Sequence, residues 1–201
     1  MARPKEFDPE HALEKAMNLF WRLGYENASL EALMQEMGIA RQSLYDTFGD
    51  KRALYLKAMA RYRDQTNSQT QKMLNEIPLV RDGFAKLLYG LAGETREQHE
   101  RGCLLLSANL QRDLKDAAIR DLLRDNQARV EAIFLQALAR AQKQGELSPK
   151  DDLGALAHFF VVTIQGMRAM ARLKSDTRAL EQVASVALRV FNSSHPRHEK
   201  N

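Results

Sequence analysis

The chain has 201 residues, enough for one large domain or two small ones, and its 44% hydrophobic and 28% charged composition excludes a disordered protein. A net charge of +4 and a pI of about 9.2 permit nucleic-acid binding without requiring it, because residues 1–64 contain ten basic and ten acidic side chains. The single cysteine, Cys103, excludes an internal disulfide.

The apolar residues repeat at helical spacing along the whole chain, and no alternating strand pattern or hairpin signal occurs. We therefore predict an all-α fold of about nine helices. The first helix should open at Asp8, whose carboxylate can cap free amides, with Pro9 at its first position, and should end at Gly24. One face of this helix carries Leu13, Ala16, Met17 and Phe20.

Two short helices follow with a tight turn between them. Ser29 is expected to cap the first of them, and Gly38 to end it in a left-handed conformation. The second should run from about residue 40 to 47, with Leu44 and Phe48 pointing inward. This pattern predicts a helix-turn-helix whose second helix exposes Arg41, Gln42, Ser43, Tyr45, Asp46 and Thr47.

The remainder of the chain predicts a larger helical body. Asp50 should cap a fourth helix, and the chain is polar from residue 66 until Pro78. The further predicted helices run from Pro78 to a break at Gly102, then over about 104–114, 115–144, 153–173 and 177–192. Residues 195–201 should form a flexible tail.

The exposed side chains of the second short helix suit the major groove of DNA. Arg41 can donate two hydrogen bonds to guanine, and Gln42 can form a bidentate pair with adenine. Arg3 and Lys5 lie on an N-terminal arm that could enter a neighbouring minor groove. The predicted phosphate contacts, which would fix register without reading bases, are Ser29, Ser43, Tyr45, Thr47 and Lys51.

Three segments resemble the TetR/AcrR repressor family. They are FWRLGYENASL at residues 20–30, MGIARQSLY at 37–45 and FGDK at 48–51, and they cover about the first third of the chain. The resemblance implies a DNA-binding domain at 1–50 and an effector-binding, dimerising domain at 51–194. It also implies a homodimer formed through the last two helices, which binds double-stranded operator DNA and responds to a small molecule. The run RGCLL at 101–105 resembles one found in a subset of the family.

Asp46 departs from the family pattern, in which this position is usually aromatic or neutral. A carboxylate beside phosphates is repulsive unless it accepts from a cytosine amino group or pairs with a cation. Arg41 and Lys51 are the two cations that could supply such a pair, so the base contacts around Asp46 stay open.

An effector pocket would lie among the helices of the larger body, although ordinary core packing is the better explanation for each of its candidate residues. The predicted effector contacts are Tyr62, Phe84, Leu88, Leu104, Ser107, Phe134, His158 and Val162.

The main hypothesis is a DNA-binding regulator, a repressor that a small-molecule effector releases from a palindromic operator, and other functions stay open beside it. A helical adaptor without DNA binding fits the neutral charge of residues 1–64, and Cys103 at a helix start could serve a redox-sensing regulator. A helical metalloenzyme would need paired Glu-x-x-His motifs, but Asp8 and His11 have that spacing only once. We therefore expect no catalytic residues, no metal and no cofactor.

The sequence favours a cytoplasmic protein without a membrane partner. The apolar run at residues 158–164 is short, and the first residues lack the apolar core of a signal peptide. The effector, the operator and the choice between repression and activation are not encoded in any recognisable motif.

Overall fold

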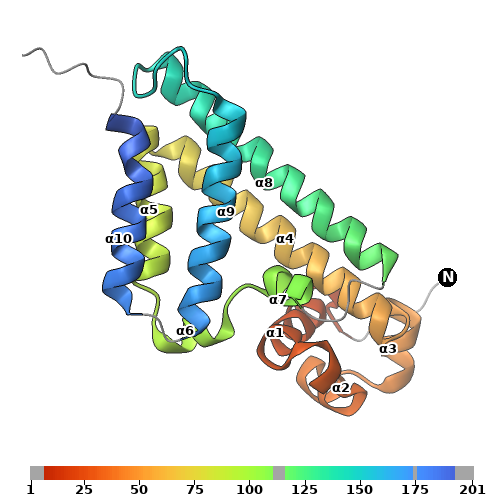
Figure 1. The fold of residues 1–201 in the computed structure, drawn as a ribbon. Helices are drawn as coiled ribbons and strands as arrows, with labels where there is room; N and C mark the ends of the chain where they lie inside the picture. The colour runs from red at the N-terminus through yellow and green to blue at the C-terminus, as the bar shows by residue number, and fades with distance from the viewer. Residues whose placement is uncertain (1–6, 111–115, 174–175, 193–201) are drawn as a thin grey trace, which may run out of the picture. The chain divides into compact units, whose positions relative to one another are not determined.

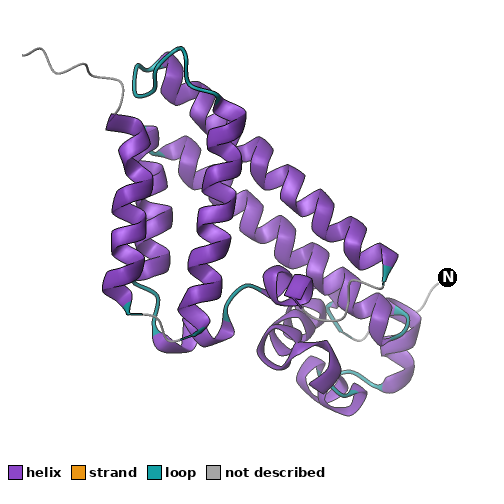
Figure 2. Cartoon of the chain, in the orientation of Figure 1, coloured by secondary structure: helices purple, strands orange, loops and turns teal. Residues whose placement is uncertain are grey.

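The computed structural model describes residues 7–110, 116–173 and 176–192, and every regular element in these ranges is a helix (Figures 1 and 2). This confirms the predicted all-α class. In chain order, the elements are α1 (Pro9–Asn27), α2 (Leu30–Met37), α3 (Arg41–Phe48), α4 (Lys51–Glu76), α5 (Val80–Ala92), α6 (Arg96–Arg101), α7 (Leu104–Leu110), α8 (Ala117–Lys143), α9 (Leu153–Arg172), α10 (Thr177–Ala187) and a closing 3₁₀ turn, η2 (Leu188–Asn192).

The predicted helix starts are confirmed by their caps. Side chains of Asp8, Ser29, Asp50, Asp152 and Asp176 accept hydrogen bonds of 2.7–3.1 Å from backbone amides in the first turns of α1, α2, α4, α9 and α10. Each cap satisfies one of the amides that a helix start leaves without an intrahelical partner. Local sequence thus determines where these five helices begin.

The predicted helix after Pro78 is wrong in its extent, because it divides into α5 and α6. Thr95 forms a reciprocal capping box with Gln98: its hydroxyl accepts from the Gln98 amide at 3.3 Å, and its own amide donates to the Gln98 side chain at 2.7 Å. This box starts a new helix after the α5 cap at Gly93. The described residues therefore contain ten α-helices where the periodicity predicted about nine.

Helix α4 continues through the polar stretch that follows Thr66. Its C-terminal carbonyls are covered by Arg140 of α8, whose guanidinium donates to the carbonyl oxygens of Leu74 at 2.5 Å, Asn75 at 3.1 Å and Ile77 at 3.0 Å. Such a side chain satisfies acceptors that the last turn of a helix leaves open. A residue more than sixty positions away therefore supports the end of α4.

The chain forms two compact units. The first comprises Met1–Thr66 and Cys103–Arg124. Its core is rich in aromatic rings, with the rings of Phe20 and Tyr55 centred 4.9 Å apart and those of Trp21 and Tyr62 4.8 Å apart, both edge to face. Edge-to-face pairs add specific geometry to the burial of large apolar surfaces.

The second unit comprises Asn67–Gly102 and Asp125–Asn201. Its core centres on Phe84, whose ring lies 4.2 Å from that of Phe160, 5.2 Å from Phe134 and 5.8 Å from Phe191 between ring centres. Helix α10 packs on α5 and α9. The predicted functional division into 1–50, 51–194 and 195–201 stays a prediction, because a compact unit need not coincide with a functional domain. Residues 193–201 lie outside the described ranges.

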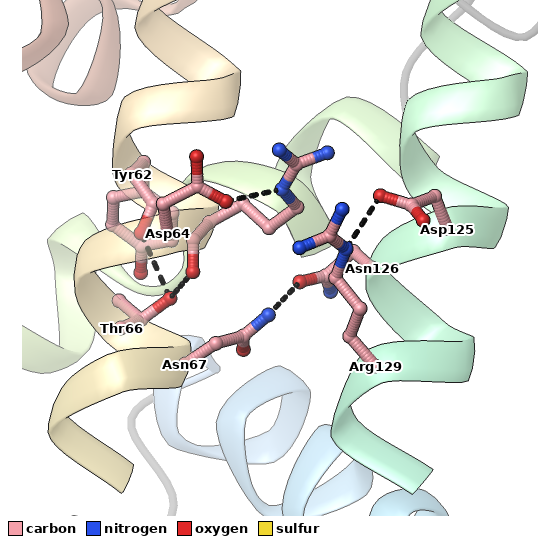
Figure 3. Close-up of polar contacts among 8 residues, drawn as sticks. Tyr62, Asp64, Thr66, Asn67, Asp125, Asn126 and Arg129 are labelled. Atoms are coloured by element: carbon pink, nitrogen blue, oxygen red, sulfur yellow. Dashed lines mark hydrogen bonds and ion pairs between the residues drawn. The ribbon is translucent and has the colours of Figure 1, made fainter. Parts of the chain in front are cut away.

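Polar side chains join α4 to α8 within the second unit. Figure 3 shows Asn67 of α4 donating to the side-chain oxygen of Asn126 on α8, at 3.2 Å, in a partly buried position. Arg129 of α8 donates to Asp125 on the same helix at 2.8 Å. A partly buried amide pair favours one register of the two helices, because any sliding leaves both amides without this partner.

Helix α9 is by length and composition the one described helix that could cross a membrane, with a mean hydropathy of 1.3 over 18 residues. Core helices of soluble proteins pass the same test. Only 22% of that window is buried in the monomer, and Phe159, Val162 and Met170 are among its exposed apolar side chains. Part of the apolar surface of α9 is therefore uncovered within one chain.

Candidate nucleic-acid interface

The turn between α2 and α3 has the geometry that its sequence predicts. Gly38 adopts a left-handed conformation with φ of +70°, and its amide donates to the carbonyl oxygen of Met34 at 2.9 Å. Ile39 then enters the core, and its amide reaches the same carbonyl at 3.2 Å. A residue with a side chain would be strained at Gly38, which makes glycine the natural end of α2.

Helix α3 is anchored by two side chains. Leu44 is fully buried and Phe48 nearly so, and both belong to the core of the first unit together with Leu33 and Met37 of α2. This confirms the predicted inward face. Because the two anchors lie four residues apart, the opposite side of α3 must face away from that core.

The opposite side of α3 is polar and open to solvent. Arg41, Gln42, Tyr45 and Asp46 are exposed, as predicted, whereas Ser43 and Thr47 are half-buried. Ala40, at the N-cap of α3, supplies no side-chain hydrogen bond to the first turn. An uncapped helix start is suited to a phosphate, because its amides and dipole both favour negative charge.

Two side-chain pairs, each spanning one helical turn, order this face. The guanidinium carbon of Arg41 lies 5.9 Å from the centre of the Tyr45 ring. The side-chain amide of Gln42 donates to Asp46 at 2.8 Å. The partner of Asp46 is thus Gln42, and not either of the cations Arg41 and Lys51 that the sequence suggested. Both candidate base-reading side chains are restrained before any DNA arrives.

Lys51 and Ser29 lie at helix starts. The ammonium of Lys51 is 4.6 Å from the centre of the Tyr25 ring and 3.4 Å from the carbonyl oxygen of Glu26, at the end of α1. The Ser29 hydroxyl accepts from the Ala32 amide at 3.1 Å, so its proton stays available for a phosphate oxygen. Their predicted phosphate contacts stay predictions.

Arg3 and Lys5, the DNA contacts predicted for the N-terminal arm, lie outside the described residues. Their role in a minor groove stays a prediction.

One ion pair joins the starts of α4 and α8. Arg52, in the first turn of α4, donates to both carboxylate oxygens of Asp116, one of them at 2.7 Å. The hydrogen bond from Arg52 is the main reason that the pKa of Asp116 is lowered from 3.8 to about 2. Asp116 also accepts from the amides of Ala118 and Ile119 and so caps α8. One carboxylate therefore connects the start of α8 to the start of α4 within the first unit.

The predicted effector residues fall in both compact units. Tyr62 and Leu104 are buried in the core of the first unit, and Ser107 of the same unit is half-buried. In the second unit, Phe84, Leu88 and Phe134 are buried together in one core. His158 and Val162 are exposed on α9, and His158 lies 3.4 Å from Glu131 of α8. Their roles as effector contacts stay predictions.

A cavity of about 400 Å³ lies elsewhere in the second unit. Its wall contains none of the predicted effector residues. The residues that line it are Leu79, Arg81, Asp82, Gln144, Gly145, Glu146 and Phe191. The volume lies within the range of small-molecule sites, but Glu146 already uses its carboxylate to accept from the amides of Val80 and Arg81 at 2.9 and 2.8 Å.

Cys103 is half-buried against the core of the first unit. The redox-sensor hypothesis for it stays a prediction. In the described residues, no three His, Cys, Asp or Glu side chains come together as a potential metal site.

Comparison with protein families gives matches at both ends of the chain. Residues 12–58 match the family described as "Bacterial regulatory proteins, tetR family". The matched segment includes α2, α3 and the turn between them. Residues 87–187 match "Tetracyclin repressor-like, C-terminal domain".

Curated relatives match over nearly the full length. The chain is 30% identical over 194 residues to YezE of Bacillus subtilis, an uncharacterised HTH-type transcriptional regulator, covering 96% of this chain and 100% of YezE. It is 33% identical over 193 residues to ComR of Escherichia coli, an HTH-type transcriptional repressor, covering 94% of this chain and 91% of ComR.

Among solved structures, a cysteine mutant of the TetR family regulator CifR, complexed with 26-base-pair operator DNA, superposes with a TM-score of 0.80. Its sequence is 33% identical, and the match covers 94% of this chain and 98% of that one.

Proposed function

The chain belongs to the TetR family and is a DNA-binding transcriptional regulator, and we propose that it acts as a homodimeric repressor that binds a palindromic operator through α3. The observation that carries this proposal is the exposed polar face of α3, on which Arg41 and Gln42 stand outward while Leu44 and Phe48 are buried. Related ComR is named a repressor, and the CifR complex holds double-strand operator DNA.

We propose that the last two helices, α9 and α10, form the dimer interface. Their exposed apolar side chains include Val162, Met170, Val183 and Val186. Apolar surface that recurs along two neighbouring helices is stable in water when a second copy covers it. A two-fold dimer would present two α3 helices to successive major-groove faces about 34 Å apart, which requires an operator with two related half-sites.

A small molecule that binds the C-terminal helices is the proposed release signal, as is typical of the family. The molecule must favour a conformation whose two α3 helices no longer match the half-sites, because only differential binding shifts an equilibrium. The regulator is proposed to work in the cytoplasm, where its DNA is, and without enzymatic activity.

Selection of bound fragments from random duplexes tests the proposal. The purified protein should enrich one palindromic sequence, and Arg41→Ala should weaken binding to it by roughly 5- to 150-fold, the loss expected when a bidentate guanine contact is removed. Arg96→Ala is the matched control, because Arg96 is an exposed arginine of α6 that already pairs with Glu100, and it should bind like the wild type. A protein that enriches no palindrome would contradict the proposal and favour the helical adaptor.

A further inference from the structure

The hydrogen bond between Gln42 and Asp46 gives the carboxylate on α3 a role. We propose that Asp46 is a positioning residue that holds the Gln42 amide in the orientation that reads adenine. The inference rests on the proposed function, since it concerns how the same helix selects a base. It accounts for a carboxylate on a face that would otherwise favour neutral or basic side chains.

The chemistry of the pair fixes which end of the Gln42 amide faces Asp46. An ionised carboxylate accepts hydrogen bonds and donates none, so the amide nitrogen must lie toward it, as observed at 2.8 Å. The amide oxygen is therefore directed away from Asp46. With the amide orientation determined, Gln42 retains one N–H group and its carbonyl oxygen for another partner.

These two remaining groups match one base edge. Adenine presents an acceptor, N7, beside a donor, the N6 amino group, in the major groove. An amide whose N–H and C=O point the same way satisfies both, provided that Asp46 takes the other N–H, the one that points away from the carbonyl. Guanine presents two acceptors at the same place, so the carbonyl of Gln42 would face an acceptor and the contact would be lost.

Restraint of Gln42 before binding improves discrimination because a free glutamine samples many rotamers and both amide orientations. The conformational entropy lost when such a side chain is immobilised on binding reduces affinity by roughly two- to tenfold. The Asp46 hydrogen bond already restricts Gln42 in the free protein, so less entropy is lost when DNA binds. The neighbouring Arg41 is similarly restrained over the Tyr45 ring. The negative charge of Asp46 has a second effect, since it repels phosphates and lowers affinity for every duplex alike.

The proposal makes affinity and selectivity move in opposite directions. Asp46→Ala removes both the charge and the hydrogen bond, so binding to an unrelated duplex should strengthen while the preference for adenine falls by roughly two- to tenfold. Asp46→Asn is the matched control, because its side-chain oxygen still accepts from Gln42 but carries no charge. It should raise affinity for all duplexes and retain the adenine preference better than the alanine variant.

The experiment begins with the duplex that the wild type selects. The position read by Gln42 is identified as the adenine whose replacement by guanine weakens binding of the wild type but not of Gln42→Ala. Dissociation constants for the adenine and guanine duplexes are then measured for the wild type, for Asp46→Ala, Asp46→Asn and Gln42→Ala, and for the double variant that combines Gln42→Ala with Asp46→Ala. In the Gln42→Ala background, Asp46→Ala should leave base preference unchanged, because a positioning residue has nothing left to position.

Three results would overturn the inference. The first is an Asp46→Ala variant that keeps the full adenine preference. The second is an Asp46→Ala variant that loses a preference for cytosine, both in the wild type and in the Gln42→Ala background. That result would mean that Asp46 itself reads a base. The third is a wild type that binds no duplex selectively, which removes the proposed function and this inference with it. The first two results leave the proposed function intact, so the two failures are distinguishable.

Discussion

The exposed face of α3 and the exposed faces of α9 and α10 are both left open by a single chain, but they differ in what orders them. On α3 the side chains are polar and already paired within the helix, Arg41 with Tyr45 and Gln42 with Asp46. On α9 and α10 the exposed side chains are apolar, and Val162 is 68% and Val186 56% exposed. The face of α3 can form hydrogen bonds and ion pairs with a charged partner. The faces of α9 and α10 expose apolar area that is stabilised when a partner excludes water from it.

The two faces should therefore respond differently to the salt concentration. Contacts to phosphates release counterions and weaken steeply with salt, whereas burial of apolar surface is nearly indifferent to moderate salt. Local ordering of α3 should lower the entropy lost on binding DNA, while the proposed interface on α9 and α10 would derive its stability from area and shape.

The largest effect expected from this contrast is the salt dependence. Raising salt from about 50 to 200 mM should weaken operator binding by roughly 10³-fold, if about six phosphates are neutralised in the complex. Dimerisation should change little over the same range, as measured by sedimentation of the protein alone. A dimer that dissociates in parallel with the loss of DNA binding would show that polar contacts dominate both faces.

The next effect is a charge placed on the apolar face. Val162→Asp combined with Val186→Asp should raise the dimer dissociation constant by at least about 100-fold, because a charge buried without a partner costs about 3–5 kcal/mol. Sedimentation velocity would show monomers at micromolar concentration, with helicity by circular dichroism unchanged. Leu79→Asp is the matched control, since Leu79 is 52% exposed in the same unit but precedes α5 rather than lying on α9 or α10. Unchanged dimers in the double variant would place the interface elsewhere.

The same contrast explains what sequence alone could predict. Helix starts, the Gly38 turn and the inward direction of Leu44 are local, because caps, left-handed glycines and helical periodicity act over one or two turns. The exposure of Arg41 and Gln42 follows from that periodicity. These features were predicted correctly for this reason.

Features that depend on distant partners were not predictable in the same way. The support of the α4 end by Arg140 joins residues more than sixty positions apart, and periodicity contains no such information. The start of α6 does have a local signal, since Thr95 and Gln98 have the spacing of a capping box, but hydrophobic periodicity alone does not detect it. The bond between Gln42 and Asp46 also has a local signal, because the two residues are four positions apart on one helix.

A smaller effect tests whether the left-handed backbone at the α2–α3 turn requires glycine at position 38. Gly38→Ala should lower the free energy of unfolding by about 1–2 kcal/mol, the cost of a left-handed residue with a side chain. A Cβ at Gly38 would meet no atom within 4 Å, so no steric clash adds to the backbone strain. Gly90→Ala is the matched control, because a Cβ there also meets open space but lies inside helix α5, where alanine should stabilise by about 0.5–1 kcal/mol. Urea denaturation measures both, and equal signs would contradict the strain argument.

The smallest effect concerns the ion pair between Arg52 of α4 and Asp116 at the start of α8. The pKa of Asp116 in the folded protein, about 2, lies below its usual 3.8, mainly because Arg52 donates to the ionised carboxylate. The carboxylate therefore stabilises the folded state fully above about pH 5, and this contribution disappears as the pH falls from about 4 to about 2. Asp116→Asn retains an oxygen that can cap α8 but removes the charge. The difference in melting temperature between wild type and Asp116→Asn should thus be constant at neutral pH and should narrow below about pH 4. Arg52→Gln removes the other partner, and its difference from the wild type should narrow over the same pH range. A difference between wild type and Asp116→Asn that keeps its size down to the lowest pH at which both proteins fold would contradict a stabilising role for the ionised carboxylate, because both side chains can cap α8.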